Sequence, residues 1–264
     1  MTLAVLRSTP YYLHYLHTPA GFLGHSYYVS SLNARVQRAF DDGACHAHIR
    51  EHLRRDSSKR PQPKKILDLP QKILSNYVFV PTQKFDDVSV QAYSRITFPQ
   101  LLHNATSFCR ERGLPLVIKI HPHLMGSSRA TQEALISQLR VSHRLVFTSR
   151  ASINFLSTHA LFTMTLNGGS LIDSFYTQTP VLSLAHGFFQ QTDALVSDDD
   201  AMRGMRRMVE RELPWAEARK LRQRQIVCWY DRMALKVGNS ARQNVAVLQA
   251  HIDALELPRR PIVL

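Results

Sequence analysis

Between residues 76 and 184, short apolar runs alternate with longer stretches that mix polar and apolar residues. Runs rich in β-branched and aromatic residues are typical of buried strands, and the stretches between them are long enough to form helices. Parallel strands need such long connections. The sequence therefore predicts the α/β class, with a parallel sheet covered by helices on both faces. The expected strands are 77–81, 116–120, 144–147, 161–165 and 180–184, and the expected helices are about 91–112, 128–140, 151–158 and 170–177.

Three parts of the chain differ in pattern. An amphipathic helix is expected over Leu32–Leu53, and the run Arg50–Lys65 holds seven cations and two prolines, which indicates an exposed linker. After residue 200 the pattern is helical, with Pro214 suited to a first helical turn and a last helix near 240–256. We therefore expect an N-terminal region of residues 1–70, a sheet domain of residues 71–200 and C-terminal helices over residues 201–264 that pack back on the core.

Charge is unevenly distributed along the 264 residues. The net charge is +13, yet residues 77–200 hold equal numbers of acidic and basic side chains, so the excess lies in the two flanks. A basic surface attracts phosphates, including those of nucleic acid, anionic lipid and nucleotide-activated substrates. Charge alone does not choose among these partners.

The three cysteines, Cys45, Cys109 and Cys228, are widely spaced and odd in number. This pattern predicts neither a disulfide framework nor a cysteine-based zinc site, and it favours a reducing cytoplasm. Arg7 and Pro10 interrupt the apolar N-terminus, and no run approaches the roughly 20 apolar residues of a membrane span. We expect a cytoplasmic protein that can contact the inner face of the membrane peripherally.

Polar residues follow directly after the first strand of the predicted sheet. Gln83, Asp86 and Asp87 would lie at its carboxyl end, where open α/β sheets bind their ligands. The alternative interpretation is a simple turn, because Asp is common in turns.

The second strand ends in Lys119-Ile120-His121-Pro122. Strand alternation places Lys119 and His121 on one side, and Pro122 stops the strand. A lysine supplies a point charge for a phosphate, and a histidine can donate a hydrogen bond to a leaving-group oxygen. The alternative is a solvated strand end, but burying Lys119 there without an anion would be costly. His123 extends the polar cluster or faces solvent.

Two further segments follow later strands. Asn167-Gly168-Gly169-Ser170 precedes a predicted helix, so it is a candidate phosphate cradle, although the same residues also suit an ordinary turn and helix cap. There is no GxxxxGK[ST] motif, and a P-loop nucleotidase is therefore not supported. His186 follows the last strand and borders the same predicted edge.

The remaining signals for metal or nucleic acid are weak. The thirteen histidines include no HExxH motif and no cysteine partners, so no metal site is predicted. The arginine-rich stretch 203–224 is interleaved with glutamates and carries no nucleic-acid-binding motif. Nucleic-acid binding is the least favoured function.

The segments YVFVPTQKFDD, PLVIKIHP and TLNGGSLIDSFYTQTPVLSL, in this order and spacing, resemble the capsule polysaccharide biosynthesis and export family, which includes bacterial Kdo transferases. The resemblance covers roughly residues 75–195. It implies a GT-B-like architecture built from Rossmann-type sheets, here with a reduced N-terminal, acceptor-side region.

The resemblance also implies roles for individual residues. The family's QxxxD motif falls on Gln83 and Asp87, which implies that Asp87 is the catalytic carboxylate. Its KxHP motif falls on Lys119, His121 and Pro122, which would hold the donor phosphate and help the nucleotide leave. Where the family usually has Glu-Ala, this chain has Asp173-Ser174, so Asp173 becomes a candidate donor contact.

The leading hypothesis is a metal-independent glycosyltransferase without a cofactor. It would use a nucleotide-activated sugar, CMP-Kdo or a similar CMP-sugar, and act on a polysaccharide or glycolipid acceptor, together with a capsule-assembly partner. The alternative is a non-catalytic family member that binds polysaccharide or assists its export.

Overall fold

The computed structural model describes the centre of the chain and parts of both flanks. The described residues are 5–8, 14–18, 42–58, 75–84, 90, 93–121, 124, 126–139, 145–148, 151–167, 169–186, 189–190, 192–210, 217–233 and 235–236.

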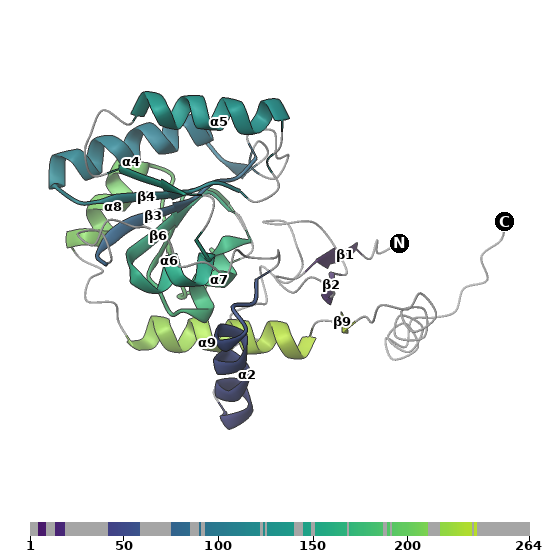
Figure 1. The fold of residues 1–264 in the computed structure, drawn as a ribbon. Helices are drawn as coiled ribbons and strands as arrows, with labels where there is room; N and C mark the ends of the chain where they lie inside the picture. Colours follow the sequence, from purple (N-terminus) through teal and green to yellow (C-terminus); the bar gives the residue numbers. More distant parts are fainter. Residues whose placement is uncertain are drawn as a thin grey trace.

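A six-stranded parallel sheet lies at the centre of the molecule (Figure 1). Its strands, in spatial order, are β5 (Leu145–Thr148), β4 (Leu116–Lys119), β3 (Tyr77–Pro81), β6 (Ala160–Thr165), β7 (Val181–Ser183) and β8 (Val196–Ser197). All neighbouring pairs run parallel. This is the strand order of a Rossmann fold, whose direction of winding reverses between β3 and β6. The predicted α/β class is confirmed, and the two-residue β8 is the one strand of this sheet that the sequence pattern missed.

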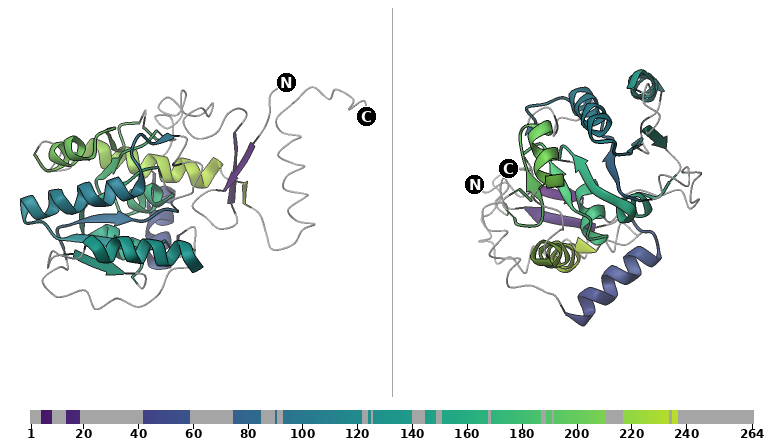
Figure 2. Two further views of the ribbon diagram at one scale, coloured as in Figure 1. Left: turned by 90° about the horizontal axis from the view of Figure 1, so that it is seen from above. Right: turned by 90° about the vertical axis from the view of Figure 1, so that its left-hand side faces the viewer.

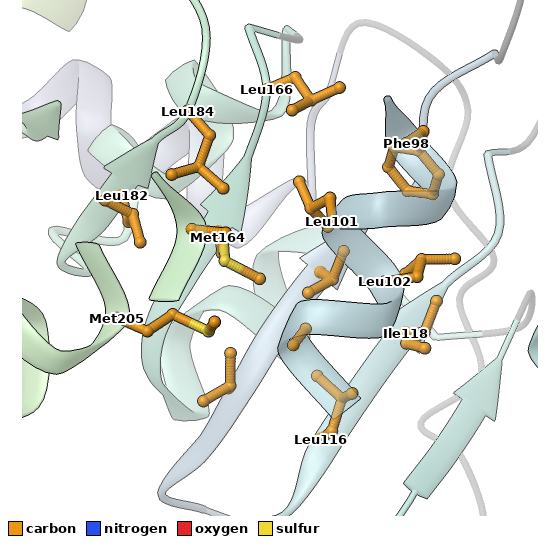
Figure 3. Close-up of a cluster of buried hydrophobic side chains, with 14 of the residues drawn as sticks. Phe98, Leu101, Leu102, Leu116, Ile118, Met164, Leu166, Leu182, Leu184 and Met205 are labelled. Atoms are coloured by element: carbon orange, nitrogen blue, oxygen red, sulfur yellow. The ribbon is translucent and has the colours of Figure 1, made fainter. Parts of the chain in front are cut away.

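Helices α4 (Phe98–Arg112), α5 (Gly126–Leu139) and α8 (Ala201–Glu210) cover one face of the sheet (Figure 1). Figure 3 shows side chains of α4 and α8, such as Leu101 and Met205, in the apolar cluster on this face. The apolar side chains of α4 pack on alternate residues of the central strands, such as Val78 and Val80. Helix α4 begins at Phe98, seven residues later than predicted, because Thr97 and Gln100 form a capping box at its start. Ser94, which precedes this cap, is paired with Ala185 in an isolated antiparallel β-bridge.

The opposite face carries α6 (Ile153–His159) and α7 (Ser170–Tyr176), which pack on Tyr77, Phe79 and Val117 and on Val181 of the strands. Buried hydroxyls join these helices to β6, because Ser174 donates to Thr163 at 3.0 Å and Ser157 donates to Ser174 at 2.9 Å. Helices α9 (Glu217–Met233) and α2 (Gly43–Arg54) lie outside α7 and cross one another (Figure 1).

A disulfide joins Cys45 of α2 to Cys228 of α9 across 183 residues of sequence. The expectation that the cysteines form no disulfide is therefore wrong. Spacing could not reveal the pair, because only the packing of two distant helices brings their Cα atoms to 5.5 Å. The odd cysteine, Cys109, is buried in α4. The cysteine argument for a reducing compartment no longer holds, and the cytoplasmic location remains a prediction.

A small antiparallel sheet combines β1 (Val5–Ser8), β2 (His14–Thr18) and β9 (Leu235–Lys236), so both ends of the described chain contribute to it (Figure 2). The sequence pattern did not predict these strands. Residues 32–41, Pro214 and the predicted helix 240–256 lie outside the described residues. Among the helices that are described, none has the length and apolar character needed to cross a membrane.

Candidate active site

The predicted polar segments follow the carboxyl ends of β3, β4, β6 and β7, and in a parallel sheet these ends share one edge. Gln83, His121, Asn167 and His186 each lie two or three residues beyond the end of one of these strands. The edge includes the reversal of winding between β3 and β6, where open α/β sheets leave a crevice for ligands. The prediction that these four segments meet at one sheet edge is confirmed.

Thr82 links the two segments after β3 and β4. Its backbone N–H donates to the carbonyl of Lys119 at 2.8 Å, and its hydroxyl oxygen accepts a hydrogen bond from the His121 N–H at 2.7 Å. Thr82 is buried and His121 is half-buried. The two motif segments are therefore fixed relative to each other beyond the point where regular strand pairing ends.

Gln83 continues this connection toward β6. Its side-chain carbonyl accepts from the Thr165 hydroxyl at 3.2 Å, and its amide donates to Asn167 Oδ1 at 3.4 Å. Its main-chain carbonyl accepts from Gln132 of α5 at 2.6 Å. Asn167 in turn donates to the carbonyl of His186 at 3.4 Å. A row of hydrogen bonds thus runs across the ends of four strands.

Lys119 is buried, with 2% of its surface exposed, and its Nζ donates to the carbonyl of Ala151 at 2.6 Å. The alternative of a solvated lysine at this strand end is therefore excluded. Burial lowers the pKa of Lys119 to about 8, and the carboxylates of Asp173 and Asp56 partly oppose that shift. Asp173 and Asp56 are therefore anions within the protein that compensate the buried charge of Lys119, and the sequence alone did not identify them.

The candidate phosphate cradle leads into α7. Gly169 is the N-cap residue of this helix and makes no side-chain cap, and Ser170 is its first residue. Asp173 lies in the first turn with 3% of its surface exposed. Asp173 therefore faces the protein interior near Lys119, rather than solvent.

Five of the predicted site residues lie outside the described residues: Asp86, Asp87, Pro122, His123 and Gly168. Their roles remain predictions. Among the described residues, Gln83, His121, Asn167 and Gly169 lie at this edge of the sheet.

A cavity of about 340 Å³ lies beside His186, at the carboxyl ends of β7 and β8. Its walls include Tyr93, Gln190 and two ion-paired arginines.

The two arginines of the cavity wall form ion pairs with neighbouring aspartates. Arg203 pairs with Asp198 at 2.5 Å, and Arg95 pairs with Asp199 at 2.6 Å. Burial acts to raise the pKa of Asp198, but the Arg203 guanidinium and backbone N–H groups outweigh it and hold that pKa below its ordinary value.

The cavity walls therefore combine cationic donors with ionised acceptors. Sequence reasoning missed Asp198, Asp199 and Arg203, because a run of three aspartates before a helix is an ordinary surface pattern. It also missed Asp56, which lies inside the basic run that indicated a linker.

Two solved structures share the fold at low sequence identity. Both are described as KpsC from Thermosulfurimonas dismutans. The beta Kdo 2,7 transferase has a TM-score of 0.54 and 16% identity, covering 95% of this chain and 78% of the other. The beta Kdo 2,4 transferase has a TM-score of 0.52 and 12% identity, covering 72% of this chain. The match spans 63% of the length of that second protein. These likenesses show the fold.

No curated protein sequence matches the chain at a significant level. A family model does match: residues 34–220, most of the chain, fit the model described as capsule polysaccharide biosynthesis protein. The match includes the strand ends, α7 and the cavity described above. The chain belongs to the capsule polysaccharide biosynthesis protein family.

Proposed function

We propose that this protein is a glycosyltransferase that uses a nucleotide-activated sugar in the synthesis of capsule or another surface polysaccharide. The observation that carries the proposal is the hydrogen-bonded row across the sheet edge. Through Thr82 it joins the segment that leads to Asp87 to the segment of Lys119 and His121. A carboxylate and a phosphate-binding pair are the groups that glycosyl transfer needs at one place.

In the proposed reaction, the bond between the sugar's anomeric carbon and the donor phosphate breaks, and a bond to an acceptor hydroxyl oxygen forms. Asp87 would take the proton of that hydroxyl as a general base or attack the sugar as a nucleophile. His121 would donate a hydrogen bond to the departing phosphate. Lys119 would supply positive charge from its buried position at the end of β4. The nucleotide leaves with the electron pair of the broken bond.

The donor that we propose is CMP-Kdo or a similar CMP-sugar, and the acceptor is a polysaccharide or glycolipid. Support for Kdo comes from the two similar folds, which are both described as Kdo transferases. Residues Asn167–Ser170 would contact the donor from the β6 side of the crevice. The sequence also suggested Asp173 as a donor contact, but its carboxylate is buried and would instead balance the charge of Lys119. The reaction as proposed needs no metal ion, because Lys119 and His121 would balance the phosphate charge.

The cavity beside His186 would accept a polar ring of one of the substrates. Its volume of about 340 Å³ is at the small end of the range for ligand pockets, so it suits one ring rather than a whole nucleotide-sugar. The paired carboxylates and guanidiniums offer acceptors and donors to sugar hydroxyls.

Replacing Asp87 with Asn tests the catalytic proposal. We expect turnover to fall by a factor of 100 or more, roughly the lower bound for loss of general acid-base catalysis. The measurement is transfer of sugar from the donor to an acceptor glycan by the purified protein, with thermal unfolding to show that the fold is intact. Glu111→Gln is the matched control, because Glu111 is exposed at the far end of α4. Unchanged glycan assembly by Asp87→Asn would instead favour a polysaccharide-binding or export-assisting role.

The donor is tested by thermal-shift measurements with CMP, UDP, GDP and their sugars. A ligand at 100 times its dissociation constant stabilises the folded protein by about 2.7 kcal/mol. We expect stabilisation by CMP or a CMP-sugar. Stabilisation by UDP alone would contradict the donor assignment while leaving glycosyl transfer in place.

A further inference from the structure

The buried ammonium of Lys119 is held by one turn of the chain, the turn that leads into α6. Its Nζ donates to the carbonyl of Ala151, the residue immediately before the helix N-cap Ser152. The Ser152 hydroxyl oxygen accepts from the N–H groups of Asn154 and Phe155 at 3.1 Å and 3.3 Å. The position of the carbonyl that binds Lys119 therefore depends on how this cap is held.

Asp56 holds the same turn from the other side. Its Oδ1 accepts a hydrogen bond from the Ser152 hydroxyl and another from the Asn154 side-chain amide at 2.9 Å. The Asn154 amide also donates to the carbonyl of Ser57 at 2.8 Å. The turn at Ala151–Asn154 is thus placed between a carboxylate that follows α2 and the lysine that ends β4.

Asp56 adopts a backbone conformation that most residues avoid, with a φ of 49°. It follows the C-cap of α2, a position that usually favours Gly or Asn. A left-handed conformation at a residue other than glycine persists when the surrounding structure over-determines it, and it points to a role for the side chain. At Asp56 the side chain is the group that binds the α6 cap.

The charged groups around Lys119 are few. Among the described residues, Asp173 of α7 and Asp56 act on it electrostatically, and half-buried His121 lies two residues further along the chain. Its partners on the neighbouring strands are uncharged, Pro81 in β3 and Thr148 in β5. Asp173 has the larger effect of the two, and removing Asp56 removes part of the compensation for the buried charge.

We propose that Asp56 is a positioning residue for the candidate active site: it orders the turn that binds Lys119 and helps to keep that lysine charged. The N-terminal flank thereby contributes a residue to the site built by the sheet. The consequence for catalysis rests on the proposed function, in which a charged Lys119 favours the donor phosphate. The coupling between Asp56 and Lys119 does not depend on that function.

The pH dependence of stability tests the coupling directly. Asp56→Asn keeps the side-chain carbonyl that can accept the same hydrogen bonds but removes the charge. At pH 7 Lys119 is charged and loses a partner in this variant, whereas above its pKa of about 8 it is neutral and loses little. We therefore expect the drop in melting temperature caused by Asp56→Asn to shrink as the pH rises from about 7 to about 9.5.

Two comparisons make this measurement specific. In a Lys119→Met background, the effect of Asp56→Asn should no longer depend on pH, because the titrating partner is gone. Asp42→Asn removes a carboxylate from the opposite end of α2, where it caps the helix by accepting from Cys45 N–H, and should show no such dependence. A drop in melting temperature that is the same at pH 7 and 9.5 in Asp56→Asn would show a purely structural role and overturn the proposal.

Binding of CMP provides the functional readout. In the wild-type protein, affinity should weaken as the pH rises through the pKa of Lys119, and Asp56→Asn should move this transition to lower pH by about one unit, the order expected for loss of one nearby carboxylate. An unmoved transition would also overturn the proposal. If CMP, UDP and GDP all fail to bind the wild type, the proposed function fails, while the stability measurements still decide the role of Asp56.

Discussion

At the scale of single residues, the candidate site is held together by polar side chains that are themselves buried. Gln83, Asn167 and Thr82 each have less than a tenth of their surface exposed, and each has a hydrogen-bond partner on a neighbouring strand end. Such groups are costly to leave without partners, so they fix the geometry of the edge. Their role in function would then be to orient Asp87 and His121.

Gln83→Ala should destabilise the fold and impair the site together. The change removes the partner of the Thr165 hydroxyl and of Asn167 Oδ1, and a buried polar group left unsatisfied costs about 1–3 kcal/mol. Denaturant unfolding and CMP binding should both report the loss. Gln138→Ala, on the exposed face of α5, is the matched control and should change neither. Wild-type stability in Gln83→Ala would show that the row of hydrogen bonds contributes little.

His52 makes the fold sensitive to acid. It is 4% exposed and stacks on Tyr176 with ring centroids 3.6 Å apart. Burial, together with neighbouring His48, lowers its pKa from 6.5 to about 3. Between these values the unfolded chain binds a proton that the folded protein does not, so stability falls as the pH drops below 6.5.

By pH 5 this difference in proton binding amounts to about 2 kcal/mol. His52→Phe keeps an aromatic ring against Tyr176 and removes the titration. We expect its stability, followed by urea unfolding, to fall less than that of the wild type between pH 6.5 and 5. His46→Gln, an exposed change on the same helix, should keep the wild-type slope. A parallel loss in His52→Phe would assign the acid sensitivity to other groups.

At the scale of elements, the structure depends on helices that meet across most of the sequence. Helix α2 packs on α7 and α9, and α7 carries Asp173 toward Lys119. The link from His48 to the Tyr176 hydroxyl, at 2.9 Å, adds a polar contact to the apolar interface. The sequence predicted an exposed linker over Arg50–Lys65, but part of that run ends α2 and reaches the α6 cap through Asp56.

The disulfide between α2 and α9 should contribute measurably to stability. Closing a loop of 183 residues limits the unfolded chain, which gives an upper value of about 5 kcal/mol in the chain-entropy model. Cys45→Ser with Cys228→Ser should therefore lower the melting temperature, and a reducing agent should do the same to the wild type only. Cys109→Ser cannot serve as the control, because Cys109 is buried in the apolar cluster around α4 and its replacement would itself affect packing. An oxidised wild type no more stable than the reduced protein would contradict the prediction.

At the scale of the whole molecule, charge separates the sheet from its flanks. The net charge of +13 lies outside residues 77–200, in the segments that precede β3 and follow β8. A protein that extends glycolipids or polysaccharide at a membrane would benefit from such flanks, because each Lys or Arg near an anionic surface adds about 1 kcal/mol of attraction.

We therefore expect the full-length protein to bind vesicles that contain phosphatidylglycerol and to be released as salt is raised from about 50 to about 500 mM, because added salt screens the attraction. Co-sedimentation with the vesicles measures this. Vesicles of phosphatidylcholine alone are the control and should retain little protein. Equal retention by both kinds of vesicle, insensitive to salt, would remove electrostatic membrane contact from the proposal.

Much of the fold could be predicted from local sequence. The runs that form β3, β4 and β6 are short, apolar and followed by turn residues, so five strands and the class of the sheet followed from pattern alone. Parallel pairing then placed Gln83, His121, Asn167 and His186 on one edge. The two-residue β8 and the strands β1, β2 and β9 escaped prediction because strands so short, or formed only by pairing across the whole chain, carry no distinct periodicity.

The sequence by itself determined the parallel sheet, the order of strands and helices along the chain, and the sheet edge at which the motif segments follow the strands. These features depend on local periodicity and on the geometry of parallel connections. Only the tertiary structure decided that Lys119 is buried near the carboxylates of Asp173 and Asp56. It also decided that Cys45 forms a disulfide with Cys228, and that Arg203 and Asp198 line a cavity. These contacts join residues that lie far apart in sequence or belong to ordinary surface patterns. Their energies arise from burial and from charges brought together by packing, which no local pattern encodes.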